Sequence, residues 1–173
     1  MRQRLIVLFL TLAVLFGCNS RMTNSNENNN CNFEFEIKQE SSIAYNYNSK
    51  TGLLNKLIDP FKSDPIYADT VFKLPNEAIC KIKKLYLEND IYDLAKDFKP
   101  KNDGIQVTPE PKYQLKFITQ DSTKEINWSR NTVLVSRENE DAKNLKAIIN
   151  LIDSLILSTP EFKSLPKGEY MWL

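Results

Sequence analysis

Three cysteines are the residues of this sequence best suited to chemistry, because the sequence contains no histidine. Without histidine, the commonest general acid–base, the Ser/His and Cys/His nucleophile systems and the commonest metal ligand are missing. A thiol can still carry a lipid, form a disulfide or act as a nucleophile. Cys18, Cys31 and Cys80 lie in three different sequence environments. We predict no enzyme activity, no metal site and no cofactor. We expect one cysteine to carry a lipid and the other two to form a disulfide.

Carboxylates offer a weaker alternative. Glu34 and Glu36 alternate on a predicted strand, so their side chains should lie about 6–7 Å apart on one face. That spacing falls within the range of glycosidase pairs, but every alternating acidic strand has it, and a solvated sheet face explains both residues. The acidic run at 138–141 suits the first turn of a helix better than a calcium loop. A hydrolase that uses carboxylates or lysine is therefore the least favoured alternative.

Cys18 follows a short basic segment and an apolar run. Arg2 and Arg4 precede residues 5–16, an apolar run interrupted only by Thr11. This run is short for a membrane span, which needs about 20 apolar residues. Residues 1–17 are therefore predicted to be a signal peptide, with a retained anchor helix as the alternative.

The stretch Leu15-Phe16-Gly17-Cys18 resembles the lipobox of bacterial lipoproteins. This resemblance implies that the Cys18 thiol is acylated, for example with palmitate, and that cleavage makes Cys18 the first residue. Each buried methylene contributes about 0.8 kcal/mol, so several acyl chains would hold the chain on a membrane. Asn19 does not match the aspartate that retains such proteins in the inner membrane of enteric bacteria. The resemblance therefore implies the cell envelope, with the outer membrane favoured where one exists, and leaves a periplasmic or surface-exposed position open.

Residues 18–30 are rich in asparagine and almost free of large apolar side chains, which predicts a flexible tether. Residues 31–173 are predicted to form a single domain. Removing residues 1–17 takes two of the 23 basic residues and none of the 22 acidic ones, so the remaining chain is close to neutral. A nucleic-acid partner is therefore not expected.

Cys80 lies on a predicted helix at 76–88, nearly opposite the apolar stripe that contains Ile82. A core thiol would share that stripe, so we predict a disulfide between Cys80 and Cys31. Closing a loop of about 50 residues would stabilise the fold by roughly 4 kcal/mol. An inert exposed thiol and a reactive thiol are the alternatives.

Hydrophobic periodicity outlines the elements that position these residues. Alternation predicts strands at 32–39, 42–48, 66–74, 113–117 and around 126–128, with 132–135 as a candidate extension. A second helix is predicted from a cap at Ser136 to a stop at Pro160. This order predicts an α+β fold: an antiparallel sheet of about four to six strands with two amphipathic helices on one face.

Aromatic residues supply the last candidate site. Tyr45, Tyr47 and Trp128 lie in or beside the inward register of their strands, which favours core packing. Tyr170 and Trp172 lie in an unusually apolar tail and form a possible binding surface. The sequence thus favours a lipoprotein whose domain binds an envelope protein and whose lipid contacts the membrane. A module that binds a glycan or a small molecule is the main alternative.

Overall fold

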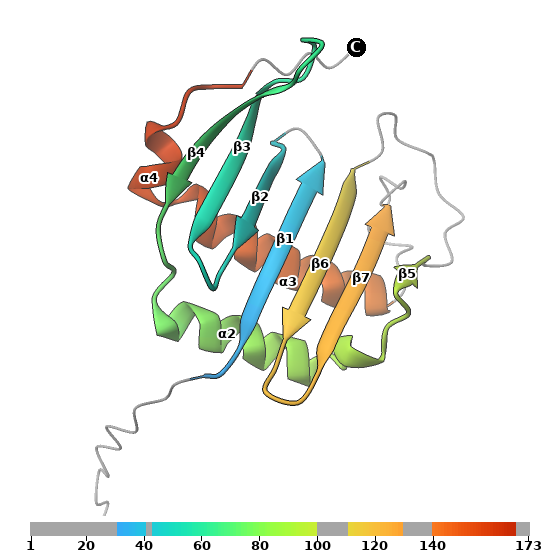
Figure 1. The fold of residues 1–173 in the computed structure, drawn as a ribbon. Coiled ribbons are helices and arrows are strands. Elements are labelled where there is room, and N and C mark those ends of the chain that lie inside the picture. Colours follow the sequence, from blue (N-terminus) through green and yellow to red (C-terminus); the bar gives the residue numbers. More distant parts are fainter. Residues whose placement is uncertain (1–30, 41–42, 100–110, 130–139, 169–173) are drawn as a thin grey trace, which may run out of the picture.

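The structure is a computed structural model that describes residues 31–40, 43–99, 111–129 and 140–168. A seven-stranded sheet carries helices α2 and α3 side by side on one face (Figure 1). In chain order the elements are β1 (Glu34–Glu40), β2 (Tyr45–Asn48), β3 (Leu53–Asp59), β4 (Ile66–Val71), α2 (Asn76–Glu88), the 3₁₀ helix η1 (Ile91–Asp93), β5 (Asp97–Phe98), β6 (Lys112–Ile118), β7 (Thr123–Ser129), α3 (Glu140–Leu157) and α4 (Pro160–Ser164).

The strands lie in the order β4-β3-β2-β1-β6-β7-β5, and every neighbouring pair is antiparallel except β5 with β7. The predicted α+β class is confirmed. The predicted antiparallel sheet of four to six strands is wrong, because the sheet is mixed and has seven strands. β5 has only two residues, too few for an alternation to be visible in sequence. β3 has leucine in both registers at Leu53 and Leu54, which hides its alternation.

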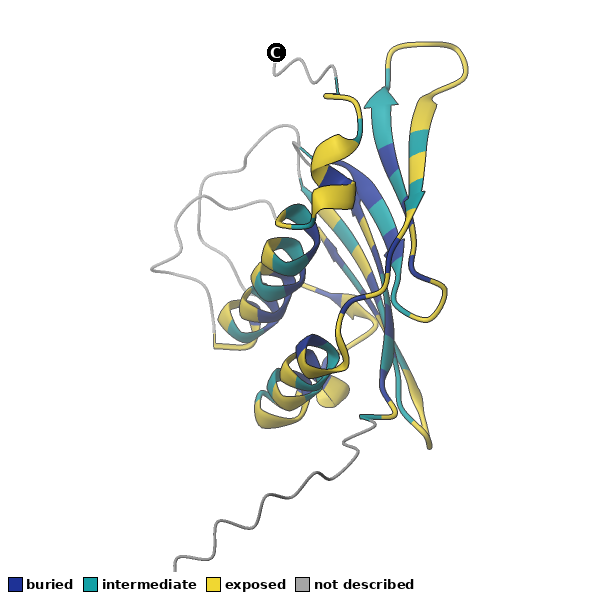
Figure 2. Ribbon diagram, turned by 90° about the vertical axis from the view of Figure 1, so that its left-hand side faces the viewer, coloured by how far each residue is buried: buried dark blue, intermediate teal, exposed yellow. Residues whose placement is uncertain are grey.

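The core lies between the sheet and α3. Strand side chains such as Phe35, Ile37 and Phe117 point to the helices and are buried. The predicted stripe of α3 packs against them through Ala142, Leu145, Ile148, Ile149, Ile152 and Ile156, which are all buried. Figure 2 shows this arrangement, with the buried surfaces of the helices turned to the sheet and their exposed surfaces turned away.

Helix α2 covers the part of the sheet near the start of β1. Its buried residues include Ile82 and Tyr86, and the Tyr86 ring lies 5.0 Å from the ring of Phe117. Cys80 lies off this buried stripe, as predicted, and is paired with Cys31 with the two Cα atoms 5.5 Å apart. The expected pair of cysteines at disulfide distance is therefore confirmed, and it joins the entry of β1 to α2.

The carboxyl end of the predicted second helix needs correction. Helix α3 ends at Leu157, and Pro160 is not its stop but the first residue of α4. Thr159 caps α4, because its hydroxyl oxygen accepts a hydrogen bond from the backbone N–H of Phe162 at 3.2 Å. The predicted cap at Ser136 and the candidate strand at 132–135 lie outside the described residues.

Candidate binding face

One face of the sheet carries the helices, and no described element covers the other face (Figure 2). Because strand side chains alternate, the residues between the core positions all point to this open face. They form two rows that cross the strands, and an apolar group at the β3–β4 end. This open face is the candidate functional site.

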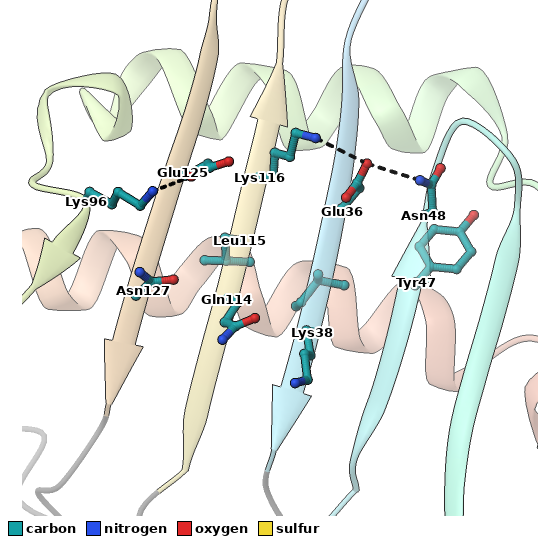
Figure 3. Close-up of a pocket in the computed structure, with 11 residues that line it drawn as sticks. Glu36, Lys38, Tyr47, Asn48, Lys96, Gln114, Leu115, Lys116, Glu125 and Asn127 are labelled. Carbon is teal, nitrogen blue, oxygen red and sulfur yellow. Dashed lines mark hydrogen bonds and ion pairs between the residues drawn. The ribbon is translucent and has the colours of Figure 1, made fainter. Parts of the chain in front are cut away.

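The first row is a ladder of alternating charges (Figure 3). Lys96 pairs with Glu125 of β7 at 2.6 Å, and Lys116 of β6 pairs with Glu36 of β1 at 3.7 Å. The side-chain amide of Asn48 on β2 donates to Glu36 at 3.2 Å. The strand register brings these residues together, since Lys116 lies directly opposite both Glu36 and Glu125. They surround a shallow depression of about 450 Å³.

The contact between Lys96 and Glu125 favours the ionised form of the Glu125 carboxylate. The hydrogen bond and the charge of Lys96 lower the pKa of Glu125, and the same contact raises the pKa of Lys96. An ionised carboxylate beside a protonated amine is suited to polar recognition and cannot donate a proton. The residues Glu34 and Glu36, considered above as a catalytic pair, each face a lysine here, with Glu34 at 3.2 Å from Lys50.

The second row is made largely of side-chain amides. Asn55 of β3 donates to Asp69 of β4 at 2.7 Å, and at the other end Asn127 of β7 donates to Asp97 of β5 at 2.9 Å. Between them the register places Asn46, Lys38 and Gln114 on β2, β1 and β6. This row gives the open face many hydrogen-bond donors and acceptors.

An apolar group lies on the open face at the edge of the sheet, and we call Leu53, Tyr67 and Val71 the apolar corner. Leu53 lies directly opposite Val71, and Tyr67 lies four residues before Val71 on the same strand, with the Asn55–Asp69 pair between them. Their exposed fractions are 40%, 53% and 65%. Exposed Phe61 and Ile66 lie in and beside the adjacent turn. A group of this kind is typical of a surface that binds a partner.

Sequence reasoning missed the apolar corner. The segment at 66–74 was predicted as a strand, but its apolar residues fall in both registers, so no outward face could be assigned. Only the pairing with β3 shows that Tyr67 and Val71 share the open face with Leu53. The one available signal was that tyrosine and valine alternate with Asp69 in a strand of six residues.

The structure places some of the sequence candidates and not others. Tyr45, Tyr47 and Trp128 are all buried on the helix side, so they belong to the core as expected. Cys18, Tyr170 and Trp172 lie outside the described residues, so the lipidation site and the aromatic tail remain predictions.

Three polar groups lie on the helix side near α4. Tyr45 donates to Asp153 of α3, and the Lys56 amine donates to the Pro166 carbonyl at 2.7 Å while lying 4.9 Å from the centre of the Phe162 ring. Burial lowers the pKa of Lys56 and raises the pKa of Asp153. Because each group contacts a defined partner, we assign them to the attachment of α3 and α4 to the sheet.

In the part of the chain that the structure describes, no three acidic, cysteine or histidine side chains gather as a metal site. Within the same residues, no helix combines the length and apolarity that a membrane span requires. Comparison with known proteins gives no match, either to a family model or to a curated sequence.

Proposed function

We propose that this chain is a lipid-anchored protein of the bacterial cell envelope whose domain is a non-catalytic binding module. The proposed ligand is another envelope protein, and the proposed contact surface is the apolar corner with the polar rows beside it. The lipobox-like segment at Cys18 supports the anchor, and the asparagine-rich residues after it would hold the domain away from the membrane. The outer membrane is the proposed location where the host has one, with the domain in the periplasm or at the cell surface.

The observation that carries this proposal is an apolar corner bordered by polar groups on an uncovered sheet face. Protein interfaces combine a desolvated apolar centre with a polar, hydrated rim. Leu53 and Val71 supply one apolar contact and Tyr67 supplies a second, and the Asn55–Asp69 pair supplies the polar groups between them.

The depression surrounded by the charge ladder favours a second candidate function, which is the binding of a glycan or a small polar molecule. It measures about 450 Å³ and is lined by Asn48, Gln114 and Asn127, whose amides suit hydroxyl groups. No aromatic ring that could stack on a sugar is exposed beside it among the described residues. Protein binding at the apolar corner is therefore the better supported function.

The proposal is tested by cross-linking capture from intact host envelopes with the full chain as bait. A double variant, Tyr67→Ser with Val71→Ser, removes the two most exposed of the three apolar side chains in the apolar corner. A matched control, Leu87→Ser with Tyr92→Ser, removes two similarly exposed apolar side chains elsewhere in the domain. We expect one partner to be enriched by the wild type and by the control, and to be lost at least about tenfold with the corner variant.

Equal capture by both variants would show that the partner binds elsewhere, and repeated failure to enrich any protein would contradict the binding-module proposal. In that second case, titration with glycans and small polar molecules tests the alternative. Binding that Gln114→Ala abolishes would then favour the depression as the site.

A further inference from the structure

The two edges of the sheet differ. At one edge β5 has only two residues, which is one of the ways in which proteins protect a sheet edge from pairing. At the other edge β4 has six residues, contains neither lysine nor proline, and is paired on one side only within the described structure (Figure 1). The β4 edge therefore lacks the protection of short length, lysine or proline, and carries only the Asp69 charge and a register irregularity near its start.

The ladder geometry shows which groups β4 presents outward. The N–H of Phe72 donates to the carbonyl of Gly52 at 3.0 Å, so residue 72 belongs to the hydrogen-bonded positions of the β3–β4 pair. These positions recur at every second residue in an antiparallel ladder. The backbone N–H and C=O groups of Tyr67, Asp69 and Val71 consequently point away from β3, to the outer edge.

The same three residues carry the side chains of the open face. Tyr67, Asp69 and Val71 present an apolar, an acidic and an apolar group in turn, and the Asp69 carboxylate is exposed. It accepts a hydrogen bond from Asn55, and no lysine or arginine pairs with it in the described part of the chain. A strand added at this edge would place its own side chains directly opposite these three.

We propose that β4 binds an extended segment of a partner protein as an eighth strand, and that this segment has the pattern apolar–x–Lys/Arg–x–apolar. This inference rests on the proposed function and names how the partner is recognised. Backbone hydrogen bonds to the outward groups of β4 provide the affinity, as in other cases of strand addition. The two apolar positions contact Val71 and Tyr67, and the basic position neutralises Asp69.

A second copy of this chain fits the edge less well. In the two-fold pairing that places Tyr67 opposite Val71 of the other copy, Asp69 lies directly opposite the same aspartate. Like charges directly opposite each other destabilise a strand pair. The Asp69 charge thus favours a basic partner over self-association.

The test uses the full chain in detergent and two fluorescent peptides, Thr-Val-Thr-Lys-Thr-Val-Thr and the same peptide with Glu in place of Lys. Fluorescence anisotropy measures the dissociation constants. We expect the Lys peptide to bind about five- to tenfold more tightly than the Glu peptide. Asp69→Lys should reverse that preference, and circular dichroism confirms that the variant is folded.

A second pair of variants isolates the backbone contribution. Val71→Ala removes the side chain and keeps the outward N–H, whereas Val71→Pro also removes the N–H without disturbing the bonds to β3. We expect Val71→Pro to bind the Lys peptide about tenfold more weakly than Val71→Ala. Equal binding by these two variants would overturn strand addition.

Other outcomes would show that something other than a partner protein pairs with the β4 edge. If the Lys peptide binds only to a variant that ends at Gly168, residues 169–173 of this chain compete for the β4 edge. That result would overturn the inference. Concentration-dependent dimerisation that Val71→Pro abolishes would assign the edge to a second copy. If neither peptide binds while envelope capture still depends on the apolar corner, strand addition is wrong and the proposed function stands.

Discussion

The hydroxyl group of Tyr45 on β2 donates a hydrogen bond to the carboxylate of Asp153 on α3, with an oxygen–oxygen distance of 2.5 Å. These residues are 108 positions apart in sequence, so the bond joins the amino-terminal half of the sheet to the last long helix. Burial raises the pKa of Asp153, and the hydrogen bond from Tyr45 opposes that rise. Burial, followed by the charge of Asp153, raises the pKa of Tyr45, which therefore stays protonated and remains the donor.

We predict that Tyr45→Phe destabilises the fold by about 1.5–3 kcal/mol at neutral pH, because it removes a hydrogen bond to a charged group. The loss should be smaller in mild acid. Without its donor, the Asp153 carboxyl has a still higher pKa in the folded state, and protonation relieves the cost of burying the charge. Urea unfolding at neutral and mildly acidic pH measures both values. A loss that is the same at the two pH values would contradict this account.

Asp153→Asn tests the same pH dependence of folding stability by removing the titrating carboxyl group. The folded-state pKa of Asp153 is raised, so between the unfolded and folded pKa values the native state binds more protons than the unfolded state. The contribution of this group to stability therefore falls as pH rises through the folded pKa. We expect the stability of Asp153→Asn relative to wild type to be greatest at neutral pH and to decline in acid, measured by the same urea titrations.

The Cys31–Cys80 pair should contribute strongly to stability. The two cysteines are 49 residues apart, and closing such a loop contributes about 4 kcal/mol in the chain-entropy model. We expect the Cys31→Ser with Cys80→Ser variant, and the wild type under reducing conditions, to lose stability by a similar amount in urea unfolding. Peptide mapping without reductant should find the two cysteine peptides linked, and unlinked peptides would refute the bridge.

Gly52 should not tolerate a side chain. Its φ is +77°, and a Cβ added there would lie 2.5 Å from the carbonyl oxygen of Phe72. Because the turn joins β2 to β3, we expect Gly52→Ala to cost about 2 kcal/mol in thermal or urea unfolding. Gly52→Asn distinguishes backbone strain from the steric clash, because asparagine tolerates positive φ better than alanine does but still has a Cβ. An unchanged melting temperature for Gly52→Ala would disprove the predicted clash.

Lipidation at Cys18 is tested by metabolic labelling with a palmitate analogue in the native host. We expect the wild type and Cys31→Ser to incorporate the label and to fractionate with membranes, because their lipobox-like segment is intact. Cys18→Ser should lose the label and leave the membrane fraction. Label retained by Cys18→Ser would exclude Cys18 as the acylated residue.

Local patterns in the sequence were enough for the elements with a regular period. The alternation of Phe35 and Ile37 predicted β1, and the isoleucine stripe through Ile148 and Ile152 predicted α3, because a buried face imposes its period on the chain. The position of Cys80 off the buried stripe of α2 likewise indicated its pairing with Cys31. The lipobox-like segment at Cys18 is also a purely local signal, and its function remains a proposal.

The candidate binding face depended on contacts that no local pattern records. Leu53 and Val71 become neighbours only through the β3–β4 register, and Glu36 meets Lys116 across about 80 residues of chain. The outward direction of the β4 backbone follows from the same pairing. The sequence alone determined the buried face of those segments whose apolar residues keep a regular period, since burial imposes a short-range period. The tertiary structure decided which residues share the open face, because strand pairing is a long-range choice among many registers.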